Sequence, residues 1–303
     1  MSTRTVQFEQ GLGRWAGNAE VFDGYGHFLG NGADYRHVQA LGDGRVRIEV
    51  SFVGPFKHSG YYLIREGPDH RLYEGPANIG YAETLSENLI DANAYWPALG
   101  LSQRFFLMVV DEDLQLSLAL MSRGEYVMYV VVGQNERVPS AAPNPHPTLV
   151  SGTHYDLSHD PTAGRGVLLL HRPGRWQGEL LGLDDTGATL GSTPYTETVT
   201  AAGAELSIVR EGGHFDPTAR RVPLLSNGWQ AWTTTAAEVV GSYSLSGGRA
   251  ASGQFYHRAV HLRCWQRSVV TLDGSRKAVV QHWYRGGCRV GVQFGVLHFH
   301  SEP

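Results

Sequence analysis

Apolar and polar residues alternate with a period of two through much of this 303-residue chain. The stretch Arg45–Val53 (RVRIEVSFV) alternates directly after turn residues at 42–44. An apolar run at 104–110, an alternating run at 114–121 (LQLSLALM) and a run at 126–132 then follow one another, with turn residues between them. Such alternation is typical of β-strands, and strands joined by short turns form a β-meander.

The C-terminal part of the chain has the same pattern. Strands are predicted at 260–270, 277–284 and 289–299, separated by turns at 273–274 and 286–287. No long stretch has the 3.6-residue apolar period of a helix, although residues 85–99 are compatible with one short helix. Many short strands predict a barrel or sandwich, and closed barrels are favoured because an open meander leaves two unpaired edges.

A five-residue motif, Gly-Arg-Trp-x-Gly, occurs at 13–17 and again at 174–178. The same offset of 161 residues, from position 13 to position 174, continues through Asp23 and Asp184, and it becomes 162 near the ends of the two copies. The chain is therefore interpreted as two copies of one domain. We predict an N-terminal domain at 1–137, a Pro-rich linker and lead-in at 138–166, and a C-terminal domain at 167–303.

Composition limits the classes of partner. The formal net charge is −4 and the basic residues are scattered, which does not suggest binding to nucleic acid or to an anionic membrane surface. No apolar run approaches the ~20 residues of a membrane-spanning helix, and the first residues lack the apolar core of a signal peptide. We therefore expect a cytoplasmic protein in which Cys264 and Cys288 are small buried residues.

Gly-x-Trp on the first strand of an antiparallel meander resembles the signature of the calycins, the lipocalin-like barrels. The residues at 13–15 and at 174–176 match it. The resemblance implies an all-β protein made of two tandem lipocalin-like antiparallel β-barrels. It also implies that each Trp closes one end of its barrel and that an Arg of the last strand packs on the Trp ring. The nearest candidates for that Arg are Arg137 and Arg289.

The tandem arrangement is similar to the two-barrel family that includes the chloroplast ATP-synthase biogenesis factor and many uncharacterised bacterial proteins. The likeness is greatest over Gly247–Phe299. Because function is grafted onto folds, the likeness specifies the fold better than the activity. The family implies a carrier of a hydrophobic ligand or an assembly factor, and the calycins also include bilin lyases and small haem-binding barrels.

Polar and aromatic residues are concentrated on two predicted strands of the second domain. His261, Arg263 and Trp265 share one face of the first strand, and His282 and Tyr284 share one face of the next. Such a face points either into the barrel, toward a ligand, or outward. We predict catalytic roles for His282 and Tyr284, since both can donate and accept a proton, and ligand-binding roles for the other three.

Further ligand-binding candidates are aromatic residues and a histidine, which could line a pocket or an inter-barrel seam, or pack in the core. They are Trp229, Trp232 and His257 in the second domain and Tyr95 and Trp96 in the first.

Two carboxylates of the first domain are catalytic candidates. Glu83 and Glu87 project to one side if the alternation at 81–87 is that of a strand. A carboxylate inside an apolar barrel has a raised pKa and can act as a general base, whereas the commoner alternative is an exposed position on a strand.

No strong catalytic signature is present in the sequence, and we expect no cofactor and no metal ion. His298 and His300 form a conceivable metal or haem pair, but residues near a chain end are usually solvated.

The favoured hypothesis is a protein that binds a small hydrophobic molecule in a barrel or inter-barrel cavity of roughly 300–1,000 Å³. It would cyclise or isomerise that molecule as a natural-product cyclase, because an apolar cavity holds a reactive conformer and excludes water. The alternatives are a non-catalytic carrier of a hydrophobic ligand or a protein-assembly factor, and then a bilin lyase or haem-binding barrel.

Overall fold

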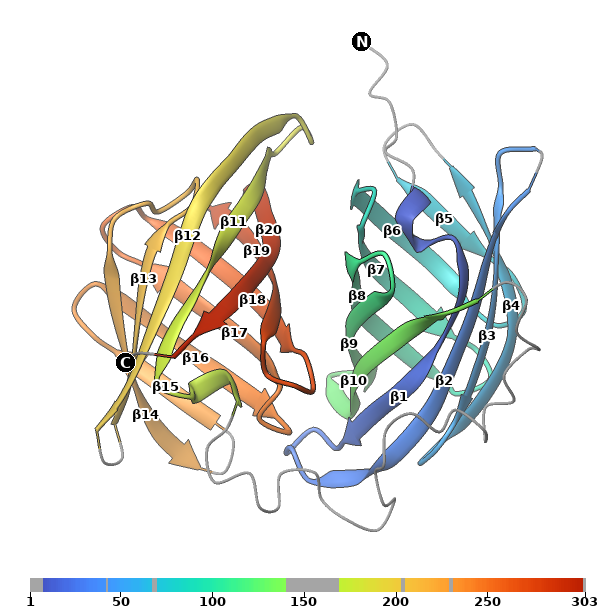
Figure 1. The fold of residues 1–303 in the computed structure, drawn as a ribbon, viewed down its shortest axis with the longest axis horizontal. Coiled ribbons are helices and arrows are strands. Elements are labelled where there is room, and N and C mark those ends of the chain that lie inside the picture. Colours follow the sequence, from blue (N-terminus) through green and yellow to red (C-terminus); the bar gives the residue numbers. More distant parts are fainter. Residues whose placement is uncertain are drawn as a thin grey trace. The chain divides into compact units, whose positions relative to one another are not determined.

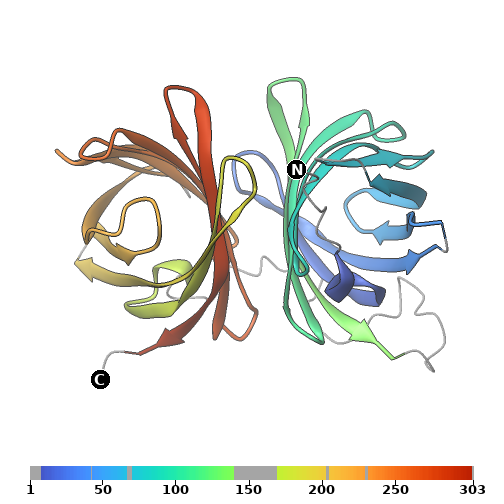
Figure 2. The ribbon, with the colours of Figure 1, turned by 90° about the horizontal axis from the view of Figure 1, so that it is seen from above.

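The computed structural model describes residues 8–41, 43–66, 70–139, 169–202, 205–228 and 231–301. The chain divides into two compact units, Met1–Ala163 and Gly164–Pro303, each of which contains one β-barrel (Figure 1; Figure 2). The predicted linker at 138–166 lies outside the described residues apart from its first two positions.

The first unit is a closed antiparallel barrel of ten strands, preceded by the short 3-10 helix η1 (Glu9–Gly11). Its strands are β1 (Gly13–Phe22), β2 (Phe28–Ala40), β3 (Val46–Val53), β4 (Lys57–Glu66), β5 (Arg71–Glu74), β6 (Ile79–Ser86), β7 (Leu89–Trp96), β8 (Leu101–Asp111), β9 (Leu114–Arg123) and β10 (Tyr126–Val138). Neighbours along the chain are neighbours in the barrel, and β1 pairs with both β2 and β10. Closure therefore leaves no strand edge unpaired.

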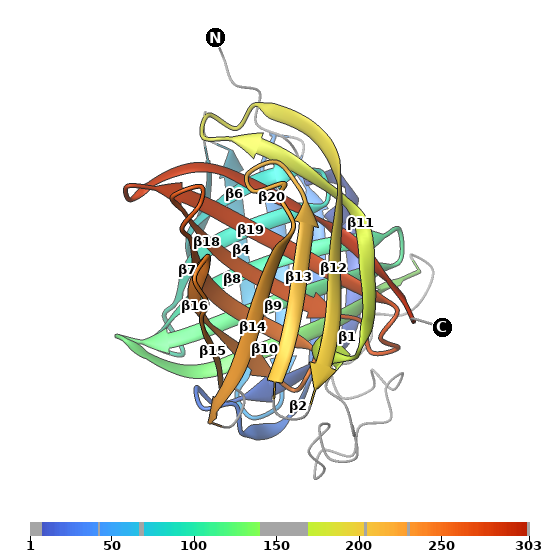
Figure 3. The same ribbon diagram turned by 90° about the vertical axis from the view of Figure 1, so that its left-hand side faces the viewer.

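The second unit repeats this topology with ten further strands, after the 3-10 helix η3 (Leu169–His171). They are β11 (Gly174–Asp184), β12 (Thr189–Ala202), β13 (Glu205–Gly212), β14 (Arg220–Gly228), β15 (Ala231–Thr235), β16 (Val239–Ser246), β17 (Ala250–His257), β18 (Leu262–Val270), β19 (Arg276–Arg285) and β20 (Cys288–His300). Figure 3 views this barrel from the wall formed by β12, β13 and β14. The predicted fold of two tandem antiparallel barrels is confirmed.

The strands predicted from alternation correspond to β3, β8, β9 and β10 in the first copy and to β18, β19 and β20 in the second. The helix considered at 85–99 was a wrong expectation, since β6 and β7 occupy this region. Ile90, Ala92, Ala94 and Trp96 all belong to the hydrophobic core. Their spacing of two residues puts them on one face of an extended strand, which a helix would not do.

The doubled Gly-Arg-Trp-x-Gly motif has a backbone explanation. Its first glycine has a positive φ in both copies, 108° at Gly13 and 137° at Gly174, which disfavours any residue with a side chain. Its last glycine lies against the last strand of the same barrel. A Cβ there would approach a carbonyl oxygen of that strand to 2.0 Å at Gly17 and to 2.3 Å at Gly178. Both glycines are therefore required by the fold.

The tryptophan of the first motif contacts both the segment before β1 and the last strand of its barrel. Trp15 is fully buried, and its Nε1 donates a hydrogen bond to the carbonyl of Gly11 at 2.9 Å. The guanidinium carbon of Arg137, on β10, lies 4.2 Å from the centroid of the indole ring, and Arg137 Nη1 donates to the carbonyl of Leu12 at 2.8 Å. The Arg–Trp contact implied by the calycin resemblance is thus confirmed for Arg137.

The second barrel uses different cations at the equivalent tryptophan. Trp176 is fully buried and pairs with Phe299, near the end of β20. The expectation for Arg289 was wrong, because Arg289 lies at the start of β20, far from this pair along the strand. Lys277 Nζ lies 4.7 Å and the guanidinium carbon of Arg172 5.9 Å from the ring of Trp176 instead.

Candidate ligand-binding cavity of the first barrel

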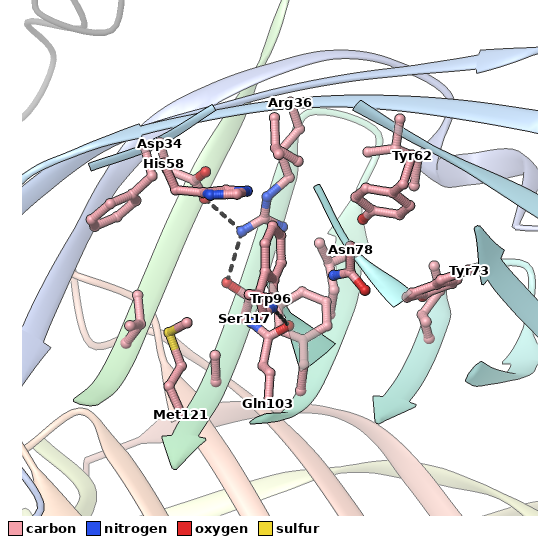
Figure 4. A pocket seen from close by; sticks show the side chains of 18 of the residues that line it. Asp34, Arg36, His58, Tyr62, Tyr73, Asn78, Trp96, Gln103, Ser117 and Met121 are labelled. Carbon is pink, nitrogen blue, oxygen red and sulfur yellow. Dashed lines mark hydrogen bonds and ion pairs between the residues drawn. The ribbon is translucent and has the colours of Figure 1, made fainter. Parts of the chain in front are cut away.

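The interior of the first barrel contains a cavity of about 110 Å³. Its apolar walls come from β2, β3, β7, β8 and β10 and include Val38, Ile48, Ile90, Phe105, Leu107 and Val131. Polar and aromatic side chains complete the lining, among them Gln115. Figure 4 labels others of this group, including Asp34, Arg36, His58, Asn78 and Ser117. The volume is below the range expected for a drug-sized ligand and is about three quarters of the ~150 Å³ of an apolar cavity known to hold benzene. In size, the cavity is therefore closer to a single ring than to a drug-sized molecule.

A largely buried ion pair is one source of the polarity of the cavity. Asp34 and Arg36 are two residues apart on β2, so their side chains project into the same barrel interior. Arg36 Nη2 lies 2.5 Å from Asp34 Oδ2, which also accepts a hydrogen bond from Asn135 Nδ2 at 3.1 Å. Arg36 Nη2 is 3.4 Å from the hydroxyl oxygen of Ser117. The two charges cancel, and the side chains of both residues are held in place.

His58 of β4 stands beside this pair. Its ring meets the Trp96 ring edge to face, with centroids 4.5 Å apart, and Trp96 Nε1 donates to Gln103 Oε1 at 2.8 Å. Burial lowers the pKa of His58, so the imidazole is neutral at neutral pH.

Two tyrosines form another part of the wall. The rings of Tyr62 and Tyr73 lie 5.2 Å apart, and burial raises the pKa of both phenols. Both hydroxyls therefore stay protonated over the physiological pH range. Together with the paired Asp34 and Arg36, these protonated phenols add polar groups to the cavity without adding a net charge.

The predicted residues of the first barrel are distributed over both faces of the sheet. Trp96 lines the cavity, whereas Tyr95 is 46% exposed on the outer face of β7. Glu83 is half-buried on the outer face of β6. Glu87 is exposed in the turn after β6, and the pairing shifts between Thr84 and Ser86, so Glu83 and Glu87 do not share a strand face. Neither carboxylate lines the cavity.

Four predicted residues of the second barrel do come together, but on its outer wall. The rings of Trp265 and His282 lie 5.7 Å apart, and those of His282 and Tyr284 6.5 Å apart. The Arg263 guanidinium carbon lies 4.8 Å from the Tyr284 ring centroid. The inner face of the same strands carries other side chains, such as Gln281. The predicted catalytic pair therefore does not reach the barrel interior.

His257, His261 and Trp232 have different surroundings. His257 is buried, and its Nδ1 lies 2.8 Å from Asp216 Oδ2. His261 is exposed in a turn, with a positive φ of 54°. Trp232 is half-buried and packs on the core of the second barrel. Trp229 lies outside the described residues.

A polar network occupies the interior of the second barrel. Lys277 Nζ hydrogen-bonds to Glu197, and Arg210 Nε lies 3.5 Å from Glu197 Oε1. Gln266 Nε2 donates to Glu197 at 3.3 Å, and Gln281 Nε2 donates to Gln266 at 3.1 Å. Burial alone would raise the pKa of Glu197, but Lys277 and Arg210 hold it at about 2. The carboxylate is therefore ionised and accepts hydrogen bonds from Lys277 and Gln266, whereas Nε and Nη2 of Arg210 have no hydrogen-bond partner within the described residues.

Other features bear on cofactors and partners. No cluster of three or more His, Cys, Asp or Glu residues arranged to hold a metal ion occurs in the described ranges, and His298 and His300 are both exposed. Cys264 is buried as expected, but Cys288 is exposed, because it begins β20 directly after a turn. Where the structure describes the chain, it contains no helix of the length and hydropathy needed to cross a membrane.

Comparison with known proteins identifies the fold. No family model and no curated protein matches the sequence. A Nostoc punctiforme protein of unknown function, from the DUF3598 family, superposes with a TM-score of 0.60 over 97% of each chain, at 13% identity. The phycobiliprotein lyase CpeS of Guillardia theta is 9% identical, with a TM-score of 0.35 over 44% of this chain and 91% of that one. At these identities the likeness to the Nostoc protein shows a common fold and nothing about activity.

Proposed function

We propose that the protein binds a small, predominantly apolar molecule inside its first barrel. The observation that carries this proposal is the cavity of about 110 Å³, whose apolar walls surround a buried and mutually oriented polar cluster. Close packing normally fills protein interiors, and burying an ion pair is costly. A cavity that contains an ion pair lowers the stability of the fold, so ligand binding explains its presence better than a structural role does.

Binding is favoured over the predicted cyclisation. His282, Tyr284, Glu83 and Glu87, the residues expected to transfer protons, do not line the cavity. Storage or delivery of a ligand needs only shape and a few orienting polar groups, which the cavity provides. The protein is therefore proposed to be a ligand-binding protein, and a reaction inside the barrel has no specific observation in its favour.

The test fills the cavity. Ala119 of β9 lines it, and Ala119→Phe places a ring in the space that a ligand would occupy. Overpacking costs about 1–3 kcal/mol, so circular dichroism must first show that the variant is folded. Ethylbenzene and acetophenone serve as probes, and binding is measured by ligand-observed NMR. We expect both probes to bind the wild-type protein and at least one to lose binding to the variant by tenfold or more.

The matched control is Ala188→Phe, the same change in an exposed turn of the second barrel. It should bind the probes as the wild-type protein does. Equal binding to the wild-type protein and to Ala119→Phe would place the probes elsewhere and would refute the proposal, as would failure of every probe to bind.

A further inference from the structure

Four residues that line the cavity each have a buried side-chain polar atom without a hydrogen-bond partner within the described residues. These atoms are Arg36 Nη1, His58 Nε2, Asn78 Oδ1 and Gln115 Oε1. The side chains of Asn78 and Gln115 are 1% and 2% exposed, so bulk water does not reach them. Buried polar groups are almost always hydrogen-bonded, and four such atoms around one cavity therefore define what should bind there.

The chemical character of these atoms is mixed. Arg36 Nη1 can only donate, and the two amide oxygens can only accept. His58 Nε2 can do either, according to its tautomer. Figure 4 shows the Arg36 side chain extending into the pocket, with Asp34 and His58 on one side of it and Tyr62 and Asn78 on the other. A ligand that satisfies both kinds of atom needs an acceptor and a donor.

Charge and shape narrow the choice. Asp34 already neutralises Arg36, so an anionic ligand would place its charge near the carboxylate of Asp34 without a free cation to compensate it. Flat aromatic surfaces from Tyr62, Trp96 and Phe105 line the cavity, and the guanidinium of Arg36 lies 5.5 Å from the Phe105 ring. Such walls favour a planar molecule.

We propose, on the basis of the binding function above, that the ligand is an uncharged planar molecule with two polar ends. An oxygen acceptor, such as a ketone or amide carbonyl, is bound by Arg36, and a hydroxyl or N–H group donates to Asn78 or Gln115. Hydroxylated aromatic ketones and aromatic amides are the chemical classes that meet these conditions within the volume of a single ring.

The experiment compares four probes of nearly the same size on the full chain at pH 7, by isothermal titration calorimetry or competition NMR. They are 4-hydroxyacetophenone, acetophenone, ethylbenzene and 4-hydroxybenzoate. A hydrogen bond to a charged donor is worth about tenfold to a hundredfold in affinity, and one between neutral groups about twofold to tenfold. We expect 4-hydroxyacetophenone to bind most tightly, then acetophenone, then ethylbenzene, with 4-hydroxybenzoate at least tenfold weaker than 4-hydroxyacetophenone.

A double variant separates hydrogen bonding to the ligand from the apolar fit of its ring. Asn78→Leu combined with Gln115→Met removes both acceptor oxygens at nearly constant volume. The advantage of 4-hydroxyacetophenone over acetophenone should disappear, while ethylbenzene binds at least as well as before. Gln254→Met, an equivalent change at an exposed position of β17, is the control and should leave all affinities unchanged.

The outcomes distinguish this inference from the proposed function. If ethylbenzene binds as tightly as 4-hydroxyacetophenone, the cavity is a ligand site but its polar atoms do not select the ligand, and the inference is overturned. Preferential binding of 4-hydroxybenzoate would overturn the requirement for a neutral ligand. If no probe binds, ethylbenzene included, the proposed function fails together with the inference.

Discussion

Glu197 is the buried anion on which the charge network of the second barrel depends, and its replacement by Gln is a direct test of that network. The change removes the negative charge but keeps the size of the side chain. Lys277 and Arg210 would then be two buried cations without a counter-charge. We expect the second barrel to lose about 3 kcal/mol or more of unfolding free energy.

Two estimates support this magnitude, one from the pKa of Glu197 and one from buried ion pairs in general. The pKa of Glu197 falls from 4.5 to about 2, and at about 1.36 kcal/mol for each pH unit this corresponds to roughly 3 kcal/mol of stabilisation of the charged form. Breaking a buried ion pair by removing one partner costs about 3–5 kcal/mol. The two estimates agree, and either is a large part of the stability of a domain.

The unfolding free energy of the second barrel should depend on pH through Glu197. Because the pKa of Glu197 is depressed in the folded state, its contribution is fully present above about pH 4.5 and is lost as the pH falls toward 2. The wild-type protein and the Glu197→Gln variant should therefore differ most near neutral pH and converge in stability toward pH 2.

Native-state hydrogen exchange with mass spectrometry is the appropriate assay, because it reports each barrel separately. Protection should fall on β11–β20 and remain unchanged on β1–β10. Glu205→Gln is the control, since its carboxylate is 46% exposed and pairs with Arg221 at the surface, where such a pair is worth about 0–1 kcal/mol. If the two variants destabilise the second barrel equally, the buried network is not what stabilises it.

Two further predictions concern the barrel end and the cysteines. Arg137→Leu should destabilise the first barrel by about 2–4 kcal/mol in urea unfolding, because it removes the contact with Trp15 and the hydrogen bonds that Arg137 donates to backbone carbonyls. Arg123→Leu, at the exposed end of β9, should cost less than about 0.5 kcal/mol, and a similar loss for both would contradict the stabilising role of Arg137. Cys288 should react rapidly with Ellman's reagent, whereas Cys264, whose pKa burial raises to about 12, should react only after unfolding; two fast thiols in the native protein would show that Cys264 is accessible.

The fold was predictable because its determinants are local in the sequence. Alternation marks the strands, and the glycines of the doubled motif mark positions where no side chain fits. Gly13 has a positive φ, and Gly17 leaves no room for a Cβ. The cations that pack on each tryptophan were harder to predict. Arg137 could be proposed from the resemblance, but Lys277 lies on a different strand from the expected Arg289.

The cavity was not predictable, for two physical reasons. Its polar residues come from separate strands, with Arg36 on β2 and His58 on β4, so no motif joins them. Alternation also defines two faces without showing which one is inside. In the run at 114–121 the leucines are the conspicuous face, yet Ser117 and Ala119, between them, line the cavity. The same ambiguity affected His282, which lies on the outer face.

The two copies carry different residues at equivalent positions of their interiors. Trp15 is paired with Arg36 across β1 and β2, and Trp176 is paired with Glu197 across β11 and β12. Arg36 of the cavity therefore occupies the same place in its barrel as Glu197, the central carboxylate of the polar network, does in the second barrel. Ala119 likewise corresponds to Gln281, whose amide extends into the second barrel. The polar residues that made the second copy conspicuous in the sequence therefore fill its interior or lie on its outer wall. In the first barrel, smaller side chains such as Ala119 leave space that Gln281 occupies in the second barrel, and a ligand can fill that space. Substitutions at interior positions of β2 and β9 should accordingly change the binding specificity of the first barrel. Substitutions at the equivalent positions of the second barrel should instead lower its unfolding free energy.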